Sequence, residues 1–199
     1  MSDVFDEPDD HATPLTAEER QALLPAHIAF RHELNIAERD NILRGENWAH
    51  RRRRGLLSEK FVRDLHRQMF GDVWRWAGVF RTTEKNIGIN YWEIAAALRM
   101  LLDDARMWIE QDVYPRDEIA LRFHHRLVQI HPFHNGNGRH ARLIADLLVV
   151  QLGGGRFSWG RGSLGNPGAL RKRYIDALRA ADNHDIGPLL DFARATRAD

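Results

Sequence analysis

The residues from His131 to Arg142 combine a side chain that can move protons with side chains that can bind anions. His131 can exchange a proton near neutral pH. Arg139 and Arg142 lie three residues apart, so on a helix both would project from one face of the same turn. Arginine binds phosphate oxygens through a planar, bidentate fork of N–H donors. This combination within one short segment indicates the transfer of a phosphate-containing group.

A helix on each side is expected to hold this segment in place. Pro132 stops the first helix, because proline has no N–H and its ring clashes with the preceding turn. Gly136 and Gly138 then permit positive φ angles and a close approach of the backbone. The second helix would start at the segment, and the N–H groups of its first turn suit a phosphate. Helical spacing of apolar residues predicts these helices over 118–130 (Ile119, Ala120, Phe123, Leu127, Val128, Ile130) and 139–152 (Ala141, Leu143, Ile144, Leu147, Leu148, Leu152).

This segment resembles the signature of Fic proteins, His-x-Phe-x-(Asp/Glu)-Gly-Asn-Gly-Arg-x-x-Arg. The matching positions are His131, Phe133, Gly136, Asn137, Gly138, Arg139 and Arg142. The resemblance extends over most of the chain and is closest to the subset called mobile mystery protein B, through residues 33–35, 69–85 and 124–127. It implies an all-α Fic fold, a helical bundle around a central helix–loop–helix motif, with one small β-hairpin flap.

The resemblance also implies a protein adenylyltransferase, which would move AMP from ATP to a Tyr, Ser or Thr hydroxyl of a target protein. His131 would be the catalytic base that accepts the hydroxyl proton. Mg²⁺, or Mn²⁺ in its place, would bridge the α and β phosphates near Asn135. The residues expected to bind the nucleotide and its phosphates are Asn135, Gly136, Asn137, Gly138, Arg139 and Arg142.

Asn135 departs from the Fic pattern, which has an acidic metal ligand at this position. A neutral amide oxygen coordinates magnesium less strongly than a carboxylate does. One alternative is therefore a Fic module that binds nucleotide or peptide with little or no transferase activity. Another is the transfer of a different phosphate-containing group, as in the phosphate-transferring Doc branch. Gly138 before Arg139 favours the adenylylating arrangement over the Doc branch.

The residues around 79–90 give a weak hairpin signal, because Val79, Arg81 and Thr83 alternate along the chain. By resemblance this hairpin would be the flap, which would hold a target segment as an added strand. The residues expected to bind the target are Lys85, Asn86, Ile87, Gly88 and Ile89. The alternative is an ordinary connecting hairpin.

Composition restricts the remaining function classes. The chain has 199 residues, 43% of them hydrophobic and 29% charged, which is ordinary for a globular protein. A formal net charge of +1 makes nucleic acid an unlikely partner, although a basic run ends at Arg54. The absence of cysteine excludes disulfides and thiol catalysis and fits a cytoplasmic location. We expect no signal peptide and no membrane span.

The rest of the chain is expected to form one helical domain. Residues 1–14 read as a flexible acidic tail, and residues 15–199 as a single Fic-type domain. Thr16 and Glu19 have the spacing of a capping box at the start of a short helix. Further helices are expected over 30–54, from Ser58 to Phe70, over 91–112, from Pro115 at the first helical position, and over 169–181 and 186–195. A glycine-rich surface loop is expected over 153–168.

Five histidines lie close together around the motif, and such a group could instead bind zinc. They are His124, His125, His131, His134 and His140. No His-Glu-x-x-His motif is present, which argues against zinc. We expect His124 to be a packing residue and His125 a surface residue. For Asp146, on an apolar helix, we expect either a satisfied buried carboxylate or an exposed one.

Regulation is not visible as a complete motif. Many Fic proteins are restrained by a helix with the pattern Ser/Thr-x-x-x-Glu-Gly/Asn. Glu46 followed by Asn47 is a half match, because Ile42 stands where Ser or Thr is required, and Glu33 is a second candidate. The hypothesis is therefore that a separate small partner, a helix-turn-helix or antitoxin-like protein, restrains a toxin-like enzyme.

Overall fold

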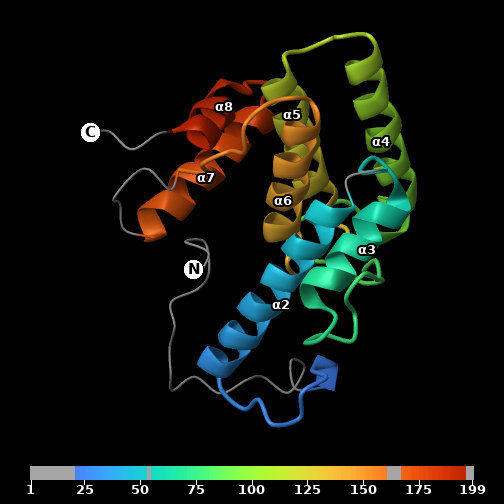
Figure 1. The fold of residues 1–199 in the computed structure, drawn as a ribbon, viewed down its shortest axis with the longest axis vertical. Helices are drawn as coiled ribbons and strands as arrows, with labels where there is room; N and C mark the ends of the chain where they lie inside the picture. The colour runs from blue at the N-terminus through green and yellow to red at the C-terminus, as the bar shows by residue number, and fades with distance from the viewer. Residues whose placement is uncertain (1–20, 53–54, 161–166, 196–199) are drawn as a thin grey trace.

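The computed structural model describes residues 21–52, 55–160 and 167–195. Its helices are α2 (Arg31–Arg51), α3 (Glu59–Phe70), the 3₁₀ turn η1 (Tyr91–Glu93), α4 (Ile94–Glu110), α5 (Arg116–Ile130), α6 (Asn137–Gln151), α7 (Pro167–Asp182) and α8 (Gly187–Arg194) (Figure 1). The prediction of an all-α fold is confirmed. The capping box at Thr16 and the acidic tail lie outside the described residues.

Helices α5 and α6 form the centre of the fold, and the loop between them carries the motif (Figure 1). Every residue of α6 from His140 to Val149 is buried. A helix that is buried all round needs neighbours on every side. Helix α4 packs against α5, α3 and α2 pack against α6, and the α7–α8 pair contacts α5. The N-terminus of α6 therefore starts from a rigid core.

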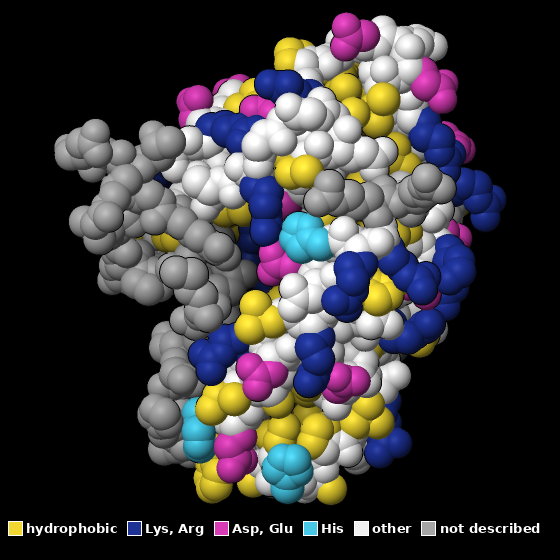
Figure 2. All heavy atoms as spheres, in the orientation of Figure 1, with side chains coloured by type: hydrophobic (Ala, Val, Ile, Leu, Met, Phe, Trp, Pro, Cys, Tyr) yellow, Lys and Arg dark blue, Asp and Glu magenta, His cyan; other side chains and the backbone are white. Residues whose placement is uncertain are grey.

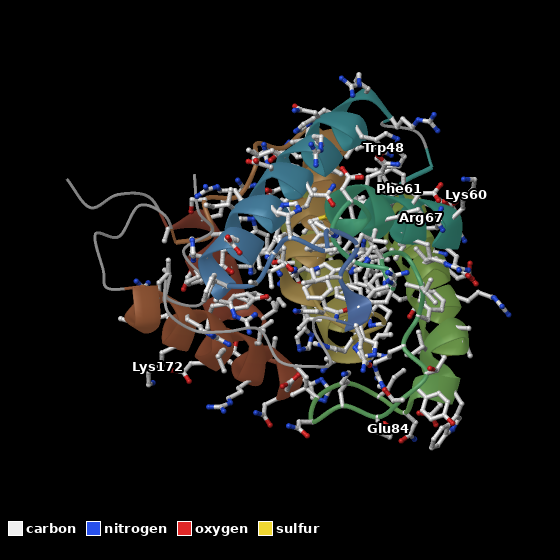
Figure 3. The ribbon with its side chains drawn as sticks, turned by 90° about the horizontal axis from the view of Figure 1, so that it is seen from below. Trp48, Lys60, Phe61, Arg67, Glu84 and Lys172 are labelled. Carbon is white, nitrogen blue, oxygen red and sulfur yellow. The ribbon has the colours of Figure 1, made fainter. Side chains whose placement is uncertain are left out.

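Helix α2 lies along α3 through a close crossing that contains buried polar groups. Asn41 donates to the Gln68 carbonyl at 2.8 Å and accepts from the Asp72 N–H at 2.8 Å. Further along the pair, the rings of Trp48 and Phe61 stack with centroids 5.7 Å apart (Figure 3). These contacts explain why α2 has polar as well as apolar residues on its inner face.

Several helix ends follow the expected chemistry. Ser58 caps α3, and its hydroxyl accepts the N–H of Phe61 at 3.2 Å. Pro115 lies one residue earlier than expected, because it is the cap of α5 and not its first helical residue. Glu33 accepts the N–H groups of Ala29 and Phe30 at 2.8 and 3.1 Å. That carboxylate is therefore used at the start of its own helix, which removes Glu33 as a candidate for restraint of the site.

The two-stranded hairpin expected over residues 79–90 is not formed. Phe80 makes an isolated antiparallel bridge with Phe133, and residues 81–90 contain no strand. The physical reason is the buried side chain of Arg81, which donates to carbonyls on both arms of the segment, at Thr83 and Ile89. A side chain, and not a backbone ladder, connects the arms. In Figure 3, Glu84 marks the outer edge of this segment.

Lys and Arg side chains gather along one edge of the face in Figure 2, over α3 and α4. On these two helices, Lys60 pairs with Asp64, Arg63 with Glu59 and Arg106 with Asp103, each one turn away. Such pairs balance charge locally and contribute little stability when exposed. None of the helices in the described part of the chain is long and apolar enough to cross a membrane.

The crossing of α2 and α3 requires glycine at position 45. A Cβ on Gly45 would lie 2.8 Å from both the Cα and the N of Met69. We expect Gly45→Ala to lower the free energy of unfolding by about 1–3 kcal/mol, because backbone atoms must move apart. Urea unfolding with an unchanged m-value measures this. Gly155→Ala is the control, because nothing lies within 4 Å of its Cβ. Equal stability of both variants would show that the crossing is loose.

Candidate active site

The α5–α6 loop forms one wall of a cavity of about 530 Å³. All the predicted nucleotide-binding residues line this cavity: Asn135, Gly136, Asn137, Gly138, Arg139 and Arg142, together with His131. The facing wall comes from α2 and α7 and includes Arg31, Glu38 and Arg171. The cavity therefore presents four arginines against one carboxylate, which favours an anionic ligand.

His131 ends α5 in a left-handed conformation, with φ 50° and ψ 60°. Its N–H donates to the Leu127 carbonyl at 3.2 Å, and Pro132 then turns the chain away from the helix axis. Burial, and then the charges of Arg81 and Lys85, lower the pKa of His131 to about 4. At neutral pH the imidazole is therefore uncharged and has a nitrogen lone pair for a proton.

The loop keeps its shape through the side chain of Asn137. Its Oδ1 accepts the N–H of Phe133 at 2.9 Å, and its Nδ2 donates to the carbonyl of Phe133 at 2.8 Å. Gly136 has a φ of 75°, and a Cβ there would lie 2.5 Å from the Phe70 ring. Asn137 is thus an orienting residue for the loop, and position 136 has room only for glycine.

His66 on α3 supports the loop, although it lies outside the sequence motif. The Gly78 N–H donates to His66 Nδ1 at 2.9 Å, so the neutral ring carries its proton on Nε2. Nε2 then donates to the Asn135 carbonyl at 3.0 Å, and the ring stacks on Phe133 at 3.7 Å between centroids. Burial lowers the pKa of His66 well below its ordinary value. The one available signal was a polar residue on the inner face of α3.

Arg139 is paired with a carboxylate that sequence reasoning also missed. Its Nη1 lies 2.8 Å from Glu38 Oε2, and the other oxygen of Glu38 accepts from Trp74 Nε1 at 2.5 Å. Arg142 lies over the ring of Tyr174, 5.6 Å from its centroid, and is 7% exposed. Both motif arginines are therefore held in place before any ligand binds.

Residues 56–149 match the Fic/DOC family, and this range contains the α5–α6 loop, most of α6 and the part of the cavity wall that they form. These residues belong to the Fic/DOC family. The family prediction made from the motif is confirmed by this match.

Curated relatives of this Fic domain include proteins named "Protein adenylyltransferase Fic". The protein from Drosophila grimshawi is 30% identical over 141 residues, which is 68% of this chain and 28% of that protein. The Drosophila melanogaster protein is 29% identical over the same share of this chain and 27% of its own length. This chain thus spans little more than a quarter of the relatives that it matches.

Solved Fic structures share the fold. The N-terminal Fic domain of a Bartonella quintana effector superposes with a TM-score of 0.65 at 19% identity, over 85% of this chain and 84% of that one. BepC from Bartonella tribocorum, solved with bound AMPPNP, gives 0.62 at 16% identity, over 90% and 97%. Fic-1 from C. elegans gives 0.60 at 25% identity, over 79% and 48%.

The residues of the Fic domain do not form a resident metal site. Asn135 offers one neutral oxygen, and that Oδ1 already accepts the Gly136 N–H at 2.7 Å. Among the described residues there is no group of three or more His, Asp or Glu side chains that could hold a metal ion. Magnesium requires several oxygen ligands, so these residues alone do not fit it.

Three of the other histidines around the motif are buried. His124 is fully buried and bonds the Tyr174 hydroxyl at 2.9 Å, and His140 bonds the Val62 carbonyl at 2.8 Å. His125 was expected at the surface, but it is 8% exposed because its ring turns to Asp182, 2.8 Å away. These separate contacts leave no shared site for zinc within the described residues.

Asp146 is the satisfied buried carboxylate that was one of the two expectations. It is 6% exposed and accepts from the N–H of Phe157 and the indole of Trp159, both at 3.1 Å. Arg156 lies 3.3 Å from its second oxygen. Burial raises its pKa. Asp146 therefore fixes the segment after α6 and stays outside the cavity.

The predicted target-binding residues reach the cavity to different degrees. Ile87 lines it and is 62% exposed. Gly88 packs against His131, because a Cβ there would lie 2.7 Å from the His131 Cβ. Lys85 acts on His131 through its charge. Ile89 contributes its carbonyl to Arg81, and Asn86 is exposed.

The carboxylate of Glu38 should weaken the binding of any anion to Arg139. We expect Glu38→Gln to lower the Kd for ATP about fivefold, which corresponds to roughly 1 kcal/mol, because a negative charge leaves the cavity while the acceptor for Trp74 remains. Titration calorimetry measures the Kd. Glu46→Gln is the control, since Glu46 lies on the same helix and pairs with Arg156. An unchanged Kd for Glu38→Gln would contradict the assignment of the phosphates to Arg139.

Proposed function

We propose that this protein is an adenylyltransferase that moves AMP from ATP to a hydroxyl of a target protein. The observation that carries the proposal is the arrangement of one uncharged histidine, His131, and two held arginines around the N-terminus of α6 in one cavity. The names of the Drosophila relatives and the nucleotide analogue bound to BepC agree with this chemistry.

In the proposed reaction the phosphates lie against the first turn of α6, whose N–H groups favour anions. Arg139 and Arg142 neutralise the β and γ phosphates. His131 accepts the proton of a Tyr, Ser or Thr hydroxyl as its oxygen attacks the α phosphorus. The bond between that phosphorus and the bridging oxygen breaks, and pyrophosphate leaves with the bond's electron pair. Positioning and charge neutralisation supply the rate enhancement that proton transfer alone does not.

Magnesium belongs to the substrate in this proposal. ATP would arrive with Mg²⁺, or Mn²⁺, as its counter-ion, and the amide oxygen of Asn135 is the loop oxygen proposed to contact it. No step of the reaction is assigned to an ion held by the protein, because the residues present do not fit one.

The flap, residues 79–90, is proposed to receive the target segment. Ile87 is a large apolar side chain that is exposed beside the cavity, and Gly88 brings the backbone of the flap against His131. A target backbone lying along this segment would place its hydroxyl near the imidazole. Since the flap has no ladder of its own, the target would pair with an irregular edge and not with a preformed strand.

The proposed cellular setting rests on the sequence resemblance alone. A toxin-like enzyme restrained by a small helix-turn-helix or antitoxin-like protein in the cytoplasm fits the resemblance to the mobile mystery subset. Two observations also favour the binding-module alternative. Asn135 has no charge with which to hold a metal ion, and Arg139 is already paired with Glu38. Assays of transfer and of nucleotide binding separate the two functions.

Replacement of His131 should abolish AMP transfer while ATP still binds. We expect His131→Ala to lower the rate by at least about 100-fold, because the hydroxyl loses its base. His131→Asn is a second variant, since asparagine tolerates the left-handed conformation of this position. Incorporation of label from α-labelled ATP into protein measures the rate, and calorimetry measures the Kd.

His134→Ala is the matched control, because His134 lies in the same loop and its ring stacks on Trp76. Transfer by His131→Ala at the wild-type rate would exclude His131 as the base. Wild-type protein that binds ATP without labelling any protein would support the binding module. Label that comes from the γ phosphate would indicate phosphorylation instead.

Introducing a carboxylate at position 135 should create a metal ligand. We expect Asn135→Asp to bind ATP more tightly in Mg²⁺ and more weakly in EDTA, because a carboxylate attracts the cation and repels the bare phosphates. The ratio of the two Kd values is the readout. An unchanged ratio would show that position 135 does not contact the metal–ATP complex.

A further inference from the structure

A single buried side chain joins the flap to His131. Arg81 is 2% exposed. Its Nε donates to the carbonyl of His131 at 2.8 Å, so the bond is to the backbone of the proposed base. The other two nitrogens donate to the Thr83 carbonyl at 3.0 Å and to the Ile89 carbonyl. One guanidinium therefore connects both arms of the flap to the end of α5.

The backbone strengthens this connection on the same side. The N–H of Arg81 donates to the carbonyl of Pro132 at 2.9 Å, next to the isolated bridge between Phe80 and Phe133. The opposite arm approaches through Gly88, whose φ is 102°. A Cβ at that position would lie 2.8 Å from Arg81 Nη2 as well as 2.7 Å from the His131 Cβ. The flap thus has no space to move closer to His131, and the bonds of Arg81 hold it at that position.

We propose that Arg81 is a positioning residue that makes the flap and His131 one rigid unit, so that a target segment on the flap is presented at a fixed distance from the imidazole. This inference rests on the proposed transferase function. Arg81 does not line the cavity, so it acts through His131 and the flap and does not contact the nucleotide.

The shape of the arginine side chain is what the connection requires. Its planar fork sends rigid donors to acceptors in different directions, whereas lysine has a single nitrogen on a flexible stem. Lysine keeps the positive charge but cannot reach carbonyls at His131, Thr83 and Ile89 together. Arg81→Lys therefore separates geometry from charge, and Arg81→Met removes both.

The charge is a second, separable contribution to His131. The charged groups around His131 come from two sides. Arg81 and Lys85 of the flap act on it from outside the cavity, and the cavity lining holds Arg31 and Glu38 from α2, Arg139 and Arg142 from α6, and Arg171 from α7. In Arg81→Lys this set is unchanged in sign. The transfer rate of Arg81→Lys should therefore keep the acid limb of its pH–rate profile in place. The rate itself should fall at every pH, because the connection to His131 is lost. Arg81→Met should move that limb to higher pH.

The experiment compares Arg81→Lys with Arg63→Lys in the full chain. Arg63 is a matched control, because it donates to the Gly78 carbonyl at 3.1 Å and lies over the Phe80 ring, yet does not contact His131. We expect Arg81→Lys to lower the rate of label transfer from α-labelled ATP about 10- to 100-fold with an unchanged Kd for ATP. Arg63→Lys should transfer at the wild-type rate.

Gly88→Ala provides a second variant in case Arg81→Lys does not fold, as judged by circular dichroism. Its Cβ pushes the flap away from His131 without changing any charge, so it should lose transfer and retain ATP binding. Wild-type transfer rates in folded Arg81→Lys or Gly88→Ala would overturn the proposal. So would an equal loss in Arg63→Lys, which would mean a general effect on folding.

An independent measurement separates this inference from the proposed function. The carbonyl ¹³C chemical shift of His131 reports its hydrogen bond to Arg81 whether or not the protein transfers AMP. A shift that changes in Arg81→Lys and not in Arg63→Lys supports the rigid unit even if the wild type transfers nothing, in which case only the proposed function fails. A shift unchanged in Arg81→Lys overturns the connection.

Discussion

The α5–α6 loop keeps its shape because buried side chains bond its inward-facing polar groups. Asn137 satisfies the N–H and the carbonyl of Phe133, and His66 satisfies the carbonyl of Asn135. An unbonded buried polar group costs about 1–3 kcal/mol, so this set of bonds strongly favours one loop conformation. The site depends on that constraint, because the loop fixes the direction of the first turn of α6 and hence of the arginines that follow.

Neutral histidines are part of the same constraint. Burial lowers the pKa of His124 to about 3 and that of His140 to about 4, so both stay uncharged in the core. The cavity above them keeps its positive charge in arginines, which do not titrate at neutral pH. Charge for binding an anion and the capacity to accept a proton are thus held by different residue types, and His131 alone among these histidines lines the cavity.

The sequence was sufficient to predict features that depend on neighbouring residues. It was insufficient to predict contacts between residues far apart in the chain. The loop, the helix starts and the cap at Ser58 follow from residues within a few positions of one another. His66, Arg81 and Glu38 meet partners that lie 69, 50 and 101 residues away in the chain. No spacing rule in one sequence connects such positions, and α2 also offered Glu33 and Glu46, which have local or unrelated partners.

For residues 79–90, the sequence predicted the correct position beside the motif but the wrong secondary structure. Alternation predicted strands at 79–90, and the segment does lie beside the motif, where Phe80 bridges Phe133. Alternation indicates an extended segment, but it does not count the acceptors that a buried arginine requires. Arg81 is buried, and its N–H groups donate to the carbonyls of Thr83 and Ile89 in its own segment. The same arms therefore close around a guanidinium instead of pairing with each other.

In the proposed reaction, Arg139 would contact a phosphate while it stays paired with Glu38. A guanidinium has five N–H donors in a fixed plane, and the pair with Glu38 is made through Nη1 at 2.8 Å. Trp74 holds the other oxygen of Glu38, so the carboxylate cannot follow the arginine far into the cavity. In the proposed reaction a phosphate would therefore approach another edge of the guanidinium, and this would restrict the direction of the chain of phosphates across the start of α6. The carboxylate that we expect to weaken anion binding would in this way also orient the anion.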